Sequence, residues 1–178
     1  MNKKLKELFH HRWNIPVLAL MHNAGPGIRL VVVANQLQVN RVSLRQSVDA
    51  LMDQQLVRKN PGYGHPLRPE YILTAAGQRV AEACSKYVST VGSSKVCYRK
   101  WSSLVLLTIH LGNQHFNDIR TDLEITPRAL TLALRSLEEE RLVKRVVEDG
   151  YPPRTSYRLF ARAEKIARQT KAIAGCLT

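Results

Sequence analysis

The sequence has 178 residues, of which 44% are hydrophobic, so it can form one or two globular domains. Its 27 Lys and Arg residues outnumber 14 Asp and Glu residues, which gives a formal net charge of +13. This charge favours a polyanionic partner, such as DNA, RNA, an anionic membrane surface or an acidic protein. The longest apolar run, Leu104 to Ile109, is much shorter than the ~20 residues of a membrane-spanning helix, so we expect no membrane span.

The cysteine content indicates a reducing compartment. The chain has three cysteines, Cys84, Cys97 and Cys176. The number is odd and the sequence has no close CxxC spacing, which argues against a disulfide scaffold or a structural zinc site. The basic residues 1–6 are not followed by the apolar stretch of a secretory signal. We therefore expect a cytoplasmic protein.

The first elements in chain order are predicted to be two helices. Residues 2–12 mix lysines with Leu5, Leu8 and Phe9, which is typical of a short amphipathic helix. Trp13 to Met21 predicts a second helix, which the Gly and Pro residues at 25–27 would end.

Residues 30–59 predict a helix-turn-helix followed by a strand. Leu30, Val33 and Leu37 are spaced by three and four, which favours a helix, although the β-branched residues 31–33 alone could form a strand. Asn40 suits the N-cap of a second helix over 41–55, the candidate recognition helix. The Gly- and Pro-rich residues 60–69 then predict a β-hairpin wing.

The middle of the chain predicts a boundary between two modules. Residues 75–88 form an amphipathic helical pattern, and the linker-like residues 89–95 contain Gly92. We place the boundary there, with modules at 1–90 and 91–178. A core helix over 98–109 opens the second module.

Residues 116–160 repeat the earlier pattern. Two helical segments, with Thr126 and Pro127 suited to the start of the second, precede a strand, a turn at 148–153 and a returning strand at 156–160. A helix over 161–174 closes the module.

The apolar positions of the two motifs coincide when the sequence is shifted by 86 residues. Leu30, Val33 and Leu37 then align with Phe116, Ile119 and Leu123, and Leu44, Val48 and Leu51 align with Leu130, Leu134 and Leu137. We interpret this as an internal duplication. The predicted fold is mainly α with small β-hairpin wings (α+β), in two tandem winged helix-turn-helix modules.

The exposed faces of the two recognition helices supply candidate base contacts. Arg and Gln can form bidentate hydrogen bonds to guanine and adenine, while Ser, Thr or Leu can contact a thymine methyl group or a phosphate. The alternative is that these residues are solvated helix faces. The candidates are Arg41, Ser43, Arg45 and Gln46 in the first module, and Arg128, Thr131, Leu132 and Arg135 in the second.

The wings supply candidate phosphate or minor-groove contacts. Alternatively, Arg68 and Arg154 pair with Glu70 or Asp149 within the hairpins. The candidates are Arg58, Lys59, His65 and Arg68 in the first wing, and Lys144, Arg145 and Arg154 in the second.

For the tryptophans and cysteines, the sequence favours structural roles. Trp13 and Trp101 occupy equivalent places before apolar helices, so core packing is favoured over base stacking. Cys84 or Cys97 could be a redox-sensing thiol, although a buried, inert thiol is favoured. No catalytic or metal-binding spacing is legible, so we expect neither an enzyme nor a cofactor or metal site.

The second module closely resembles the HxlR family of bacterial transcription regulators. The resemblance rests on Lys100-Trp101, His115 to Arg120, Ile125 to Leu130, Leu137 to Val143 and Pro152 to Tyr157. The first module resembles a more diverged copy. The resemblance implies a winged helix-turn-helix, DNA binding through the second helix of the turn and the wing, and dimerisation through the terminal helices. The family's N-terminal redox cysteine has no counterpart in residues 1–13.

These observations predict a DNA-binding transcriptional regulator whose two modules act as an intrachain pseudo-dimer on a quasi-palindromic double-stranded site. Terminal helices could pair two chains into a homodimer, and no effector is indicated. The alternatives are a winged-helix protein-interaction scaffold and a non-specific architectural nucleic-acid-binding protein.

Overall fold

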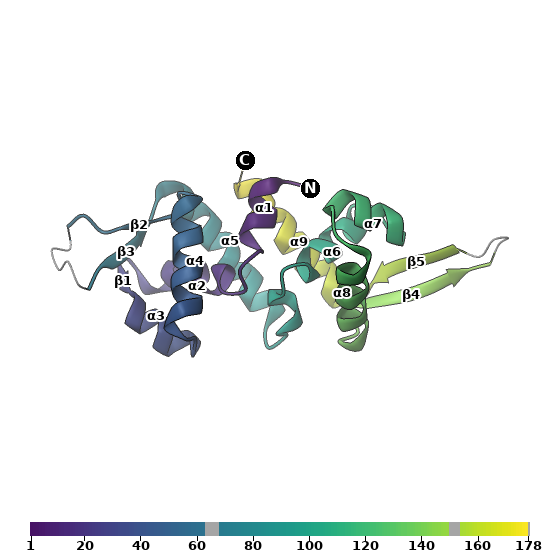
Figure 1. Ribbon diagram of the computed structural model, residues 1–178, viewed down its shortest axis with the longest axis horizontal. Helices are drawn as coiled ribbons and strands as arrows, with labels where there is room; N and C mark the ends of the chain where they lie inside the picture. The colour runs from purple at the N-terminus through teal and green to yellow at the C-terminus, as the bar shows by residue number, and fades with distance from the viewer. Residues whose placement is uncertain (63–67, 150–153, 178) are drawn as a thin grey trace.

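The computed structural model describes residues 1–62, 68–149 and 154–177. The molecule is elongated, with one β-hairpin near each end and both chain termini close to the middle (Figure 1). None of the described helices is long and apolar enough to cross a membrane.

The first half of the chain combines short helices with a three-stranded antiparallel sheet of order β1-β3-β2. The register pairs Arg29 with Glu70 and Lys59 with Tyr71. Its elements are α1 (Lys3–Leu8), α2 (Asn14–Ala24), β1 (Ile28–Arg29), α3 (Leu30–Leu37), α4 (Arg41–Asp53), β2 (Val57–Lys59), β3 (Glu70–Leu73) and α5 (Ala75–Val91).

The second half, which begins after α5, repeats this order with a two-stranded sheet in its described residues. An isolated bridge between His115 and Ser156 lies where β1 pairs with β3 in the first half. The elements are the 3-10 helix η1 (Val96–Tyr98), α6 (Ser102–His110), α7 (Phe116–Leu123), α8 (Pro127–Glu139), β4 (Val143–Glu148), β5 (Arg154–Leu159) and α9 (Ala161–Cys176).

Both turn motifs use the same local chemistry. Gln38 and Glu124 adopt the left-handed conformation and end the first helix of each motif. The Asn40 side chain accepts a hydrogen bond from the Ser43 amide, and Thr126 caps α8 in the same way. The predicted helix-turn-helix segments are thus confirmed.

Four elements begin 86 residues after their counterparts. α3 and α7, α4 and α8, β2 and β4, and α5 and α9 are related by this offset, which equals the offset of the apolar pattern. An origin by duplication stays a prediction.

Some predicted helix bounds were wrong. The first helix ends at Leu8 rather than continuing to residue 12, and the helix expected over 98–109 begins at Ser102. Arg99 has extended backbone angles, φ −75° and ψ 145°, so a helix cannot pass through it. β1 was not predicted, because a two-residue strand depends on its distant partner β3.

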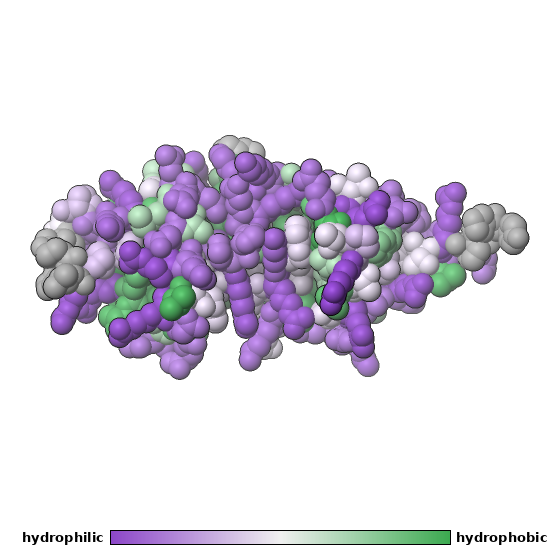
Figure 2. Space-filling view, viewed as in Figure 1, coloured by the Kyte–Doolittle hydropathy of each residue, from purple (hydrophilic) through white to green (hydrophobic). Residues whose placement is uncertain are grey.

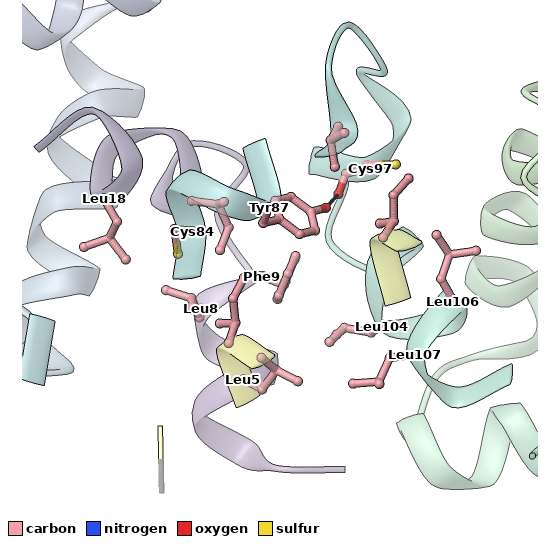
Figure 3. Packing of buried hydrophobic residues seen from close by; sticks show 14 of the residues in the cluster. Leu5, Leu8, Phe9, Leu18, Cys84, Tyr87, Cys97, Leu104, Leu106 and Leu107 are labelled. Atoms are coloured by element: carbon pink, nitrogen blue, oxygen red, sulfur yellow. Dashed lines mark hydrogen bonds between the residues drawn. The ribbon is translucent and has the colours of Figure 1, made fainter. Parts of the chain in front are cut away.

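The core is continuous between the two halves. α5 packs against α2 and α9, and α9 also packs against α6. Tyr87 of α5 is fully buried in this region, where its hydroxyl is within hydrogen-bond distance of the Cys97 carbonyl, at 2.9 Å, and of the Ser103 hydroxyl. Leu5 and Leu8 of α1 are also fully buried, and Figure 3 shows them beside the same cluster.

Candidate nucleic-acid interface

α8 presents an exposed, mainly polar face because three of its leucines are used by the core. Leu130, Leu134 and Leu137 are buried, as the 3.6-residue period requires. The positions between them are exposed, namely Arg128, Thr131, Leu132 and Arg135.

The exposed side chains of α8 differ in their freedom to contact a ligand. Arg135 is 3.2 Å from Glu139 one turn along the helix, and the Thr131 hydroxyl donates to the Pro127 carbonyl at 2.9 Å. Arg128 has no ion pair or hydrogen bond with another residue in the described part of the chain. Its guanidinium is therefore the one on α8 most available to a partner.

α4 presents the equivalent face in the first half. Arg41, Arg45 and Gln46 are exposed, while Ser43 is half-buried. Arg45 is held by Asp49 at 3.2 Å and by the Tyr71 hydroxyl at 3.4 Å.

Val31 and Val42 were not predicted to belong to this surface, yet they are 47% and 70% exposed. They line a groove of about 980 Å³. In the sequence, Val42 directly follows a charged residue at the start of the predicted helix. This position alone does not indicate whether the valine is exposed or buried. The groove's polar lining includes Arg29, Arg41, Arg45, Gln46 and Arg68.

The hairpins carry exposed cations. The exposed cations are Arg58 and Lys59 of β2, Arg68 just before β3, Lys144 and Arg145 of β4, and Arg154 at the start of β5. His65 lies outside the described residues. The alternative that Arg68 and Arg154 pair with Glu70 or Asp149 is not observed among the described residues, where Glu70 instead accepts a hydrogen bond from Asn60.

The cysteines and tryptophans contribute to packing. Cys84 and Cys97 are buried, and desolvation raises the pKa of both thiols above the ordinary value, which disfavours the reactive thiolate. Trp13 and Trp101 are half-buried against the core, each with a cation over its ring, from Arg12 at 5.1 Å and Lys100 at 4.9 Å. Among the residues that the structure describes, no cluster of three or more His, Cys, Asp or Glu could hold a metal ion.

A family model described as "HxlR-like helix-turn-helix" matches residues 96–175, from η1 to the end of α9. The matched residues, the HxlR-like domain, contain α8 and the β4–β5 hairpin, while α4 and its hairpin lie outside the match.

A 68-residue segment of the chain is 40% identical to an uncharacterized HTH-type transcriptional regulator from Methanothermobacter thermautotrophicus. The alignment covers 38% of this chain and 52% of that protein, so the chain spans about half the length of this relative. No solved structure matches the chain. Both descriptions are of helix-turn-helix proteins.

Proposed function

We propose that the protein is a sequence-specific, double-stranded-DNA-binding transcriptional regulator that acts in the cytoplasm. The HxlR-like domain, the similarity to an HTH-type transcriptional regulator and the net charge of +13 support this proposal. In a winged helix-turn-helix, the second helix of the turn enters the major groove, which assigns base contact to α8 and α4.

The two halves act as an intrachain pseudo-dimer of tandem modules, residues 1–90 and 91–178. The observation that carries this proposal is that α4 and α8 both lie at the front of the molecule, with the hairpins at its two ends (Figure 1). The same face is predominantly hydrophilic (Figure 2). One duplex lying across this face would meet both helices.

The two modules read different half-sites. At the offset of 86 residues, Arg45 corresponds to Thr131, Gln46 to Leu132, and Asp49 to Arg135, so the two exposed faces offer different donors and acceptors. A homodimer with identical halves would read a palindrome. Here the site is quasi-palindromic, with half-sites about one helical turn, ~34 Å, apart.

Selection of duplexes from fragmented genomic DNA tests the function. The purified chain is incubated with the fragments at near-physiological salt, and the bound pool is sequenced. Enrichment of one bipartite motif with unequal halves is expected. Retention without any motif would instead indicate an architectural nucleic-acid-binding protein.

A protein-interaction scaffold is the second candidate, because the exposed residues Val31 and Val42 line the groove beside α4. Exposed apolar surface in a groove is typical of protein-binding sites. If the chain retains no duplex in the selection at any salt concentration, this candidate is favoured.

A further inference from the structure

Val42 is the second residue of α4 and, at 70%, the most exposed of the large hydrophobic residues that the structure describes. The core does not use this side chain. Leu44, Val48 and Leu51 are the apolar residues of α4 that are buried, and they hold the helix against the rest of the first half. The two methyl groups of Val42 are therefore available to a partner.

The surroundings of Val42 combine apolar surface with positive charge. Val31 of α3 is also exposed and lines the same groove. The polar lining of this groove includes Arg29, Arg41 and Arg68. Figure 2 shows apolar side chains in this part of the front face, surrounded by hydrophilic ones. Single exposed valines are common on protein surfaces, but two of them in a cationic groove complement a ligand that carries both negative charge and apolar groups.

Duplex DNA is such a ligand, because thymine methyl groups lie in its major groove between two phosphate backbones. The place of Val42 on α4 fits this partner. The N-terminal residues of a recognition helix contact base edges, and Val42 lies in the first turn, two residues after the N-cap Asn40.

The corresponding position of α8 has a different chemistry. At the offset of 86 residues, Val42 aligns with Arg128, which lies two residues after the N-cap Thr126. Equivalent places on the two helices thus present a guanidinium group in the second half and two methyl groups in the first. An arginine suits guanine, which offers two acceptors to it, whereas a valine offers no hydrogen bond to any base.

A valine can nevertheless distinguish thymine from the other standard bases. Thymine alone has a methyl group at its major-groove edge, and contact between this group and a valine removes apolar surface of both from water. The amino group of cytosine or the N7 acceptor of a purine would instead lose water beside a side chain that cannot replace the lost hydrogen bond. Contact with Val42 therefore favours thymine.

We propose that Val42 is a specificity-determining residue whose methyl groups contact the methyl group of one thymine in the half-site read by the first half of the chain. This inference rests on the proposed function, since it requires α4 to enter the major groove. Val31 extends the apolar surface on the α3 side of the groove. The arginines that line the groove neutralise the phosphates on either side of this thymine.

Single deoxyuridine substitutions test the proposal. Deoxyuridine keeps the hydrogen-bonding groups of thymidine and lacks only the methyl group. Each thymine of the selected motif is replaced in turn, and affinity is measured for the unaltered chain and for Val42→Ala. At one thymine, deoxyuridine should weaken binding of the unaltered chain about fourfold, which corresponds to about 0.8 kcal/mol for one methyl-sized apolar group. The same substitution should have no effect on binding of Val42→Ala.

Val42→Ala should fold, because the replaced side chain is exposed and alanine favours helices. Leu111→Ala is the matched control, because it removes an exposed apolar side chain outside the two recognition helices and should keep the full effect of deoxyuridine. Val42→Arg provides a second readout. It should prefer guanine over the same thymine by about fivefold or more, since a bidentate contact is worth at least about 1 kcal/mol of discrimination.

The outcomes separate this inference from the function on which it rests. A chain that selects no motif overturns both. If a bipartite motif is selected, but every deoxyuridine substitution has the same effect on Val42→Ala as on the unaltered chain, only the role of Val42 is overturned. Loss of the deoxyuridine effect in Leu111→Ala as well would also overturn it, because the effect would then not depend on Val42 specifically.

Discussion

Arg128 is exposed near the start of α8, and within the described residues no acidic side chain holds it. Arg128→Ala should lose about 1–3 kcal/mol of binding free energy on the preferred duplex and relax the base choice at one position. Arg128→Lys should keep most affinity for unrelated duplexes, because the charge remains while the bidentate geometry is lost. Titration of preferred and unrelated duplexes measures both. An equal loss on every duplex for both variants would contradict a base contact.

Gly77 is a second informative residue, because α5 approaches the Leu56 backbone closely there. A Cβ atom at this position would lie 1.8 Å from the Leu56 carbonyl oxygen. Gly77→Ala should therefore lower the free energy of unfolding by about 1–3 kcal/mol, the usual effect of overpacking. Urea unfolding measures this change. Substitution of the exposed neighbour, Gln78→Ala, is the control. Equal free energies of unfolding for the two variants would show that α5 can shift away from Leu56 without loss of stability.

At the scale of the elements, the hairpins are expected to act through charge rather than base recognition. Arg154→Ala should weaken binding to all duplexes alike and reduce the salt slope by about 1, because one phosphate contact is lost. Lys86→Ala is a suitable control, since Lys86 lies on α5 and is paired with Glu82 at 2.8 Å. Affinity measured over a series of salt concentrations tests the prediction. A change in sequence preference with Arg154→Ala would assign base contact to the hairpin.

The recognition helices offer a test of the unequal half-sites. Giving α4 the exposed side chains of α8, through Val42→Arg, Arg45→Thr, Gln46→Leu and Asp49→Arg, should make the two halves of the selected motif alike. The physical reason is that base choice follows the donors and acceptors on the exposed face, while the buried leucines that orient the helix are unchanged. Repeating the duplex selection with this variant measures the effect. An unchanged motif would show that α4 does not read bases.

At the scale of the whole molecule, the continuous core through α5 and α9 should fix the distance between α4 and α8. Inserting 5 base pairs, about half a helical turn, between the half-sites should turn one half-site away from the protein. Affinity should then fall by about 10²-fold or more, because simultaneous engagement is lost. A competition assay with the spaced duplexes measures this loss. Equal affinity for both spacings would mean that the modules bind independently.

Local chemistry in the sequence was sufficient to predict both helix-turn-helix segments. Asn40, Thr126 and Pro127 mark helix starts through contacts with their immediate neighbours, and the leucine spacing identifies the buried faces of α4 and α8. The exposure of the described candidate cations on these helices and on the hairpins followed from the same periodicity.

Only the tertiary structure decided how these segments meet. The Arg45–Tyr71 contact, the pairing of β1 with β3, and the burial of α1 leucines beside Tyr87 join residues that are distant in the chain, so no local pattern encodes them. Ala50 and Ala76 line a cavity in the first half, whereas Arg99 and Arg162 cross the corresponding region of the second half. An alanine in a sequence carries no sign of the space beside it, because that space depends on which elements surround it.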